Sequence, residues 1–243
     1  MKMERPADDV AVAIETKITA PITWTLQSKF KIQDIRDNQH EEVLTLIKHH
    51  YFREEPMCKS IKLLKDSASV SGYLDLIRIW LKDTTSLIAI SAKSGRIIGV
   101  AITRINSFLY KSNTYSRVQI FTGEALEAMM RLKGALVKQA NIYESTGHDT
   151  YLCIYVICVH PSYKNKGIEK GLLDACSRAA TNMKISLLAG IFTSNNDQSI
   201  ARKMEYSILT QIPYKHWIID NNVVFDDTEI ENYSAAFMIL LKT

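Results

Sequence analysis

The feature that most constrains the fold is a wholly apolar segment, Tyr151 to Val159, that ends at a basic turn. A strand without polar alternation is buried on both faces, so it needs cover above and below. After His160-Pro161 the chain runs through Lys164-Asn165-Lys166-Gly167-Ile168-Glu169 into an amphipathic helix that reaches Met183. Such a turn directs backbone N–H groups and the positive end of the helix dipole at one point. We therefore predict an anion-binding site there.

Hydrophobic periodicity on either side of this segment predicts a mixed sheet flanked by helices on both faces. The expected strands are 24–35, 86–92, 97–105, 151–159, 186–192, 206–214 and 234–242. The expected helices are one that Asp37 or Asn38 caps and that ends before Pro56, and then 57–64, 70–81, 124–143, 167–183 and 197–204. Residues 1–22 lack a clear period and are predicted to be a poorly ordered leader, so residues 23–243 form the one expected domain.

Composition excludes several classes of function. The 243 residues carry a formal net charge of +4 with dispersed lysines and arginines, which does not favour nucleic-acid binding. The longest apolar runs fall far short of the roughly 20 residues that cross a bilayer, and the N-terminus lacks the apolar stretch of a signal peptide. The four cysteines show no spacing typical of a metal site. We expect a cytoplasmic protein with reduced core cysteines, no metal and no membrane partner.

The order of strand, His160-to-Ile168 turn, amphipathic helix, strand, helix and Tyr206 resembles the core of the GNAT superfamily of N-acetyltransferases. Residues 51–57, Tyr-Phe-Arg-Glu-Glu-Pro-Met, and the ending from Tyr233 to Lys242 are similar to the insect arylalkylamine N-acetyltransferase branch. The resemblance covers residues 24–243. It implies an α/β (α+β) fold with a mostly antiparallel mixed sheet whose central strand splays from its neighbour.

The resemblance also implies that acetyl-CoA is the acyl donor and a small primary amine, arylalkylamine-like, is the acceptor. Backbone groups of Ile157, Cys158 and Val159 would pair with the pantetheine, and the N–H group of Cys158 or Val159 could stabilise an oxyanion. The pyrophosphate would lie against the residues of the turn. These are Lys164, Asn165, Lys166, Gly167, Ile168, Glu169 and Lys170.

Amine acetylation needs a base, because the attacking amine is protonated at neutral pH. By resemblance Glu55 is the candidate, whereas the residues alone would also fit a solvated acidic pair with Glu54. The serine pair of the similar enzymes maps to Thr193 and Asp197. Thr193 keeps a hydroxyl and Ser194 lies beside it, whereas an ionised Asp197 could not donate a proton and would otherwise serve as a helix N-cap.

Two residues depart from the family pattern. Glu169 stands where the turn motif has Gly or Ala, and Glu205 stands where Gly usually precedes the aromatic residue, here Tyr206. These departures keep a second hypothesis open, a non-catalytic acyl-CoA-binding or interaction protein with the same fold. A nucleotide-binding protein is disfavoured, because the chain contains neither GxxxxGK[ST] nor GxGxxG.

Overall fold

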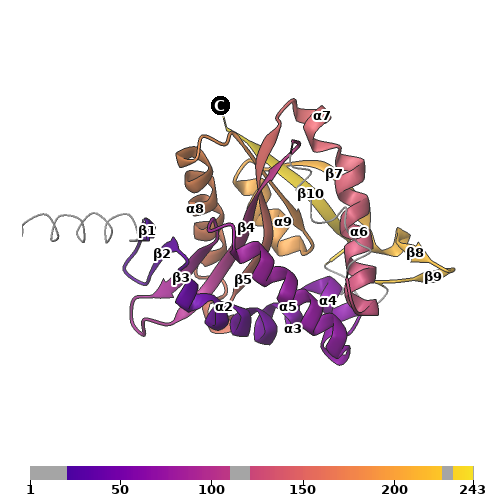
Figure 1. Ribbon diagram of the computed structural model, residues 1–243, viewed down its shortest axis with the longest axis horizontal. Helices are drawn as coiled ribbons and strands as arrows, with labels where there is room; N and C mark the ends of the chain where they lie inside the picture. Colours follow the sequence, from indigo (N-terminus) through magenta and orange to yellow (C-terminus); the bar gives the residue numbers. More distant parts are fainter. Residues whose placement is uncertain (1–20, 110–120, 226–231, 243) are drawn as a thin grey trace, which may run out of the picture.

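A twisted eight-stranded sheet forms the centre of the computed structural model, which describes residues 21–109, 121–225 and 232–242 (Figure 1). Its strands, in spatial order, are β1 (Thr23–Leu26), β2 (Phe30–Asp34), β3 (Leu87–Ser91), β4 (Ile97–Ser107), β5 (Thr150–Val159), β6 (Leu187–Phe192), β10 (Ser234–Leu241) and β7 (Ser207–Pro213). Only β5 and β6 pair in parallel, and every other pairing in this sheet is antiparallel. A short ribbon of β8 (Ile218–Ile219) and β9 (Asn222–Val223) stands apart from the sheet.

Helices cover both faces of the sheet, each over its own apolar core. One face carries α2 (His40–Leu46), a π-helical turn (Ile47–Tyr51), α3 (Phe52–Glu54), α4 (Pro56–Ser60), α5 (Ser67–Leu81), α6 (Glu124–Ala140) and α7 (Ile142–Thr146). The other carries α8 (Ile168–Asn182) and α9 (Asn195–Lys203), as Figure 1 shows. The predicted fold class is confirmed. Within the described ranges, no helix has the length and apolar character that a membrane crossing requires.

The strand β5 contains one extra residue. Val156 pairs with Ile102 of β4, but the next pair joins Ile154 to Thr103, so Tyr155 has no opposite residue. A single insertion of this kind is a β-bulge, which bends a strand and increases its twist. The parallel pairing of β5 with β6 reaches Ile154 and Gly190 and goes no further. The bulge therefore lies where β5 leaves β6, and the predicted splay of the central strand is present.

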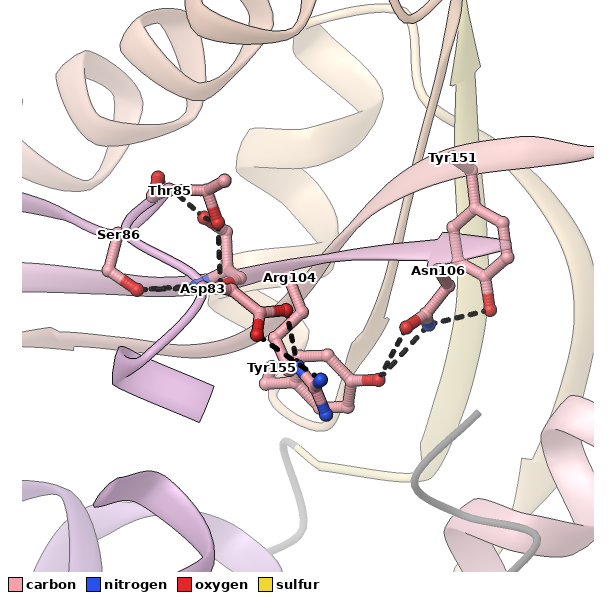
Figure 2. A network of polar contacts seen from close by, with 8 residues as sticks. Asp83, Thr85, Ser86, Arg104, Asn106, Tyr151 and Tyr155 are labelled. Atoms are coloured by element: carbon pink, nitrogen blue, oxygen red, sulfur yellow. Dashed lines mark hydrogen bonds and ion pairs between the residues drawn. The ribbon is translucent and has the colours of Figure 1, made fainter. Parts of the chain in front are cut away.

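Polar contacts hold the strands together around this bulge (Figure 2). The Thr103 backbone N–H donates to Ser86 Oγ at 3.1 Å, and Thr103 Oγ1 donates to the Thr85 carbonyl at 2.7 Å. On the other side, Asn106 Nδ2 donates to the hydroxyl oxygens of Tyr151 and Tyr155, each at 3.0 Å. Buried polar groups without partners are costly, so this network favours the one register in which all of them pair.

Three predicted elements were wrong in their continuity. The expected helix 57–64 ends as α4 at Ser60, and Lys62, with a left-handed φ of 54°, precedes a separate 3-10 turn. The expected strand 24–35 is a hairpin, in which the Gln27 N–H donates to the Phe30 carbonyl at 2.9 Å between β1 and β2. The alternation of apolar and polar residues continues through the turn, so the turn could not be recognised from this pattern. The expected helix 124–143 breaks at Asn141, whose left-handed φ of 41° ends α6 before α7 begins.

Part of the predicted leader is described. Residues 1–20 lie outside the described ranges, whereas Ile22 lies within them and contacts β2: its N–H donates to Asp34 Oδ2 at 2.9 Å.

A shared cap fixes the junction between α5 and α6. Asp66 Oδ1 accepts from the N–H groups of Ala68 and Ser69 at the start of α5, each at 3.1 Å. Ser69 Oγ in turn accepts from the Leu126 N–H of α6 at 2.9 Å. Gly123, with φ of 102°, lets the chain pass directly over this cap. The arrangement sets how α5 and α6 lie against each other.

We predict that Gly123→Ala destabilises the protein by about 2–4 kcal/mol, because an added Cβ would lie 2.6 Å from Ser69 Cα at a backbone angle that only glycine adopts easily. Gly147→Ala is the matched control. Gly147 also has a positive φ, 68°, but nothing lies within 4 Å of an added Cβ, so only the backbone cost of about 1 kcal/mol remains. Urea unfolding of both variants measures the difference, and equal losses would contradict the packing argument.

Candidate functional site

A cleft of about 340 Å³ opens beside the C-terminal end of β5, where β5 no longer pairs with β6. Its walls are the π-helical turn with the α3–α4 junction, the last residues of β5, the turn before α8 with Glu169, the N-terminus of α9, and Asn232, which lies before β10. Several residues predicted from the sequence meet in this cleft. They are Glu55, Ile157, Cys158, Val159, Lys164, Asn165, Glu169 and Ser194.

Glu55 is a buried carboxylate at the α3–α4 junction. Pro56 forces an extended backbone on Glu55, with ψ of 127°, so the helix breaks there and Glu55 becomes the N-cap of α4. Its Oε2 accepts from the Cys58 N–H at 2.6 Å, while its Oε1 is buried without a partner. The side chain is 6% exposed, so Glu55 is not one of a solvated pair, although Glu54 is exposed. One carboxylate oxygen of this cleft-lining residue therefore has no hydrogen-bond partner among the described residues.

The backbone from Val156 to Val159 has β4 as its strand partner on one side, and among the described strands it has none on the β6 side. A narrow gap of about 20 Å³ separates it from residues 191–193. Backbone N–H and C=O groups facing such a gap can pair with an extended ligand, as they would with another strand. Burial raises the pKa of the Cys158 thiol to about 12, so this cleft-lining sulfur is not a nucleophilic thiolate at neutral pH.

The turn before α8 has the uncapped helix N-terminus that the anion-site prediction requires. Gly167 precedes α8 with a left-handed φ of 78°, and no side chain caps the first N–H groups of the helix. Lys164 reaches across the cleft and forms an ion pair with Glu54. The α8 N-terminus therefore offers uncapped N–H groups and the positive end of a 15-residue helix.

Other residues of the turn point away from this cleft. Lys166 and Ile168 line a separate hollow of about 460 Å³, and the Lys166 ammonium lies 4.7 Å from the centre of the Tyr163 ring. Gly167 and Lys170 line a third hollow beside β1. Their predicted contact with a pyrophosphate stays a prediction.

At the α9 end the structure reverses one prediction. Ser194, not Asp197, is the N-cap of α9, since Ser194 Oγ accepts from the Asp197 N–H at 3.1 Å. Asp197 lines both the cleft and the gap between β5 and β6. Burial, and then repulsion from Glu169, raise the pKa of the Asp197 carboxyl despite its contact with Ser194. Thr193 lines only the gap, where its carbonyl accepts from the Tyr214 hydroxyl at 2.6 Å.

The two residues that depart from the family pattern have different surroundings. Glu169 is half-buried in the first turn of α8 and lines the cleft, so its charge acts on the site. Glu205 is exposed, with φ of 68°, in the turn after α9. A left-handed backbone conformation favours glycine. The backbone geometry alone therefore explains the glycine of the family pattern, and no chemical role for this position is needed.

One histidine that lines the cleft, His50, packs against a second histidine. The rings of His50, in the π-helical turn, and His160, after β5, lie 4.5 Å apart in an edge-to-face arrangement. Burial and the neighbouring His160 lower the pKa of His50, so the neutral ring is favoured. Helical turns of the π type are rare and often occur at functional sites.

Sequence reasoning missed a buried lysine beneath the cleft. Lys133 of α6 is 1% exposed, and its Nζ donates to the Tyr73 hydroxyl at 3.3 Å. The signal was present, because Lys133 lies four residues after Met129 and four before Val137, on the face that those residues bury. The prediction for this helix named only its apolar residues and did not consider Lys133.

Comparison with known proteins places this geometry in a fold family. No protein-family model matches the sequence, and no curated protein matches it. Among solved structures, a candidate arylalkylamine N-acetyltransferase 7 of the yellow fever mosquito Aedes aegypti is similar at a TM-score of 0.82 and 24% identity, over 91% of this chain and 95% of that one. Arylalkylamine N-acetyltransferase 2 of Aedes aegypti follows at 0.77 and 18%, over 88% and 99%.

A polyamine N-acetyltransferase of Drosophila melanogaster is similar at a TM-score of 0.72 and 13% identity, over 87% of this chain and 99% of that one. Together these likenesses show that the chain has the GNAT fold.

We predict that Asp197→Asn stabilises the protein at neutral pH. The raised pKa means that the folded protein binds this proton more tightly than the unfolded chain, so stability falls as pH rises through the folded-state pKa. Asn removes that loss, and the gain should vanish below about pH 4. Thermal melts of both proteins across this pH range measure it. Asp149→Asn, at an exposed site, is the control, and an equal gain there would contradict the assignment.

Proposed function

We propose that this protein is an acyl-CoA-dependent N-acetyltransferase that transfers the acetyl group of acetyl-CoA to a small primary amine, arylalkylamine-like in class. The observation that carries the proposal is the Glu55 carboxylate. It is buried, lines the cleft and keeps Oε1 without a partner. A buried acceptor of this kind is suited to take a proton from a bound ammonium or amine.

The residues present fit an acyl-CoA in two respects. The uncapped N-terminus of α8 with Lys164 would hold the pyrophosphate, and the unpaired side of β5 at 157–159 would hold the pantetheine. Glu54 and Glu169 oppose such an anion, but Lys164 already neutralises Glu54. When bound, the acyl-CoA supplies a thioester as the acyl donor.

The chain's own groups divide the proton transfers between the two ends of the cleft. Glu55 Oε1 accepts a proton from the amine, directly or through water, as the nitrogen attacks the acyl carbon. The departing sulfur then takes a proton from the α9 end, where the Ser194 hydroxyl and the Asp197 carboxyl lie. The raised pKa of Asp197 increases the population of its protonated, donating form. Because the Cys158 thiol stays protonated, direct transfer is favoured over an acyl-cysteine intermediate.

The charge of the cleft supports an amine as acceptor. Three glutamates, Glu54, Glu55 and Glu169, line it, against Lys164 as the one lysine or arginine in the described lining. Excess negative charge raises the local concentration of a cationic substrate. Similar structures are named arylalkylamine and polyamine N-acetyltransferases, which supports the same class.

A non-catalytic acyl-CoA-binding or interaction protein is the second candidate. One observation favours it: Glu169 faces the cleft at the start of α8 and interacts electrostatically with Asp197. A carboxylate in the first turn of a helix repels an incoming phosphate.

We predict that acetyl-CoA raises the melting temperature and that free thiol appears only when an amine is added. At a hundred times the dissociation constant, the ligand should stabilise the protein by about 2.7 kcal/mol. A thermal-shift titration followed by a thiol-release assay over aromatic and aliphatic amines measures both. If the wild type fails to bind, gain of binding by Glu169→Gly with no turnover would support the second candidate instead.

We predict that Glu55→Gln lowers kcat/KM about 10²–10⁴-fold while acetyl-CoA binding is kept, because the amide cannot accept the proton. Glu41→Gln is the matched control, since Glu41 is exposed in α2 and pairs with Arg78 outside the cleft. Initial rates and a thermal shift for both variants decide the matter. A rate for Glu55→Gln equal to that of the control would remove Glu55 from the mechanism.

A further inference from the structure

Three turns surround a hollow of about 460 Å³ at one end of the sheet, on the face that α8 covers. They are the β1–β2 turn at 27–29, the β3–β4 turn at 92–96 and the turn from β5 to α8 at 160–167. The Ala92 N–H donates to the Lys29 carbonyl at 3.0 Å, which joins the first two turns. Sequence-distant residues are thus held around one concave surface.

The hollow is separate from the candidate cleft, because no described residue lines both. The turn before α8 forms the wall between them. Its residues Lys164 and Asn165 line the cleft, whereas Tyr163 and Lys166 line the hollow. A ligand in the hollow would therefore contact a set of side chains that the proposed acyl-CoA site does not use.

The floor of the hollow is apolar and rigidly held. Phe30 of β2, Ile98 of β4 and Ile168 of α8 are all buried and belong to the core beneath α8. The aromatic ring of Tyr163 lies beside them. Small-molecule pockets are typically concave, mostly apolar and roughly 300–1,000 Å³ in volume. The hollow has this size and character.

The polar side chains around this floor are all hydrogen-bond donors. The described lining holds three lysines and three serines and no carboxylate: Lys29, Lys93, Lys166, Ser28, Ser91 and Ser162. Ser91 is buried, and its Oγ accepts from the Ser94 N–H at 3.3 Å, while its own proton has no acceptor among the described residues. Such a set of donors lacks an acceptor, and an anion supplies one.

The positive charge of the hollow is not neutralised by the described residues. Lys166 Nζ donates to the Ser162 carbonyl at 2.7 Å and lies 4.7 Å from the centre of the Tyr163 ring, so it is held at the wall without a counter-ion. Lys29 and Lys93 likewise form no ion pair within the described ranges. Like charges around one hollow repel each other, and an anion between them would relieve that repulsion.

We propose that this hollow is a second binding site, which takes a small organic anion: a carboxylate, sulfonate or phosphate group on an aromatic or aliphatic body. The anionic group would lie between Lys29 and Lys93, and the apolar body would pack on Phe30 and Ile98. The charge is opposite to that of the cleft, where glutamates outnumber the one lysine of the described lining. The inference does not depend on the proposed function.

A pair of matched fluorescent probes tests the site. 8-Anilinonaphthalene-1-sulfonate is an aromatic anion, and N-phenyl-1-naphthylamine has the same rings without the sulfonate. We expect the protein to bind the sulfonate more tightly. Lys29→Gln with Lys93→Gln should weaken sulfonate binding about fivefold and leave the neutral probe unchanged. Equal affinity of the wild type for both probes would overturn the anion specificity.

A control variant separates the hollow from the overall charge of the protein. Lys82→Gln with Lys138→Gln removes two exposed lysines outside the hollow, so it changes the net charge equally. We expect this control to bind the sulfonate like the wild type. The same loss of affinity in both double variants, or no loss in either, would overturn the assignment to the hollow.

Competition with acetyl-CoA tests whether the two sites are distinct. We expect the sulfonate to stay bound at saturating acetyl-CoA, because the cleft and the hollow share no described residue. Displacement of the probe would overturn the second site and make the hollow part of the cofactor site. If acetyl-CoA does not bind at all, the proposed function fails, and the two double variants still decide whether the hollow binds an anion.

Discussion

The extra residue in β5 is the constraint on which the rest of the site depends. Tyr155 has no opposite residue in β4, and directly before it, at Ile154, the pairing of β5 with β6 ends. The insertion also changes which face later side chains meet, so Tyr155 and Val156 both lie in the core beneath α5 and α6. A regular strand would keep pairing with β6 and leave no free backbone. One unpaired residue therefore produces the gap, the cleft beside it and the access of Tyr51 to both.

Much of the fold could be predicted from the sequence, because burial patterns in β5 and α8 report their environments directly. The apolar run 151–159 predicted a strand covered on both faces, and the amphipathic stripe after Gly167 predicted its helix. The hairpin inside 24–35 could not be read, since alternation has the same period on both sides of a turn. The bulge at Tyr155 was equally hidden, because register is a property of two strands and one strand's sequence does not contain it.

The site was predictable only where a local motif carries the geometry. Pro56 breaks the helix at Glu55 by sterics alone, so the motif at residues 51–57 was enough to predict a carboxylate at the end of the first helix. Asp197 was the predicted N-cap, but Ser194 takes that position, because both residue types are good N-caps and only the tertiary fold decides between them. Lys133 was missed because its residue type favours a position different from the one that it has. Its residue type argues for solvent, and the Tyr73 hydroxyl to which it donates belongs to a helix far away in the chain.

The ion pair between Lys164 and Glu54 means that an anion entering the cleft must compete with a carboxylate for Lys164. The two residues come from opposite walls and are each partly exposed. An arriving phosphate would replace the carboxylate as the lysine's counter-ion, and Glu54 would return to water. Phosphate binding would then replace one ion pair of Lys164 with another. Its net electrostatic gain, and the sensitivity of binding to added salt, would therefore be smaller than a new lysine–phosphate ion pair alone would give.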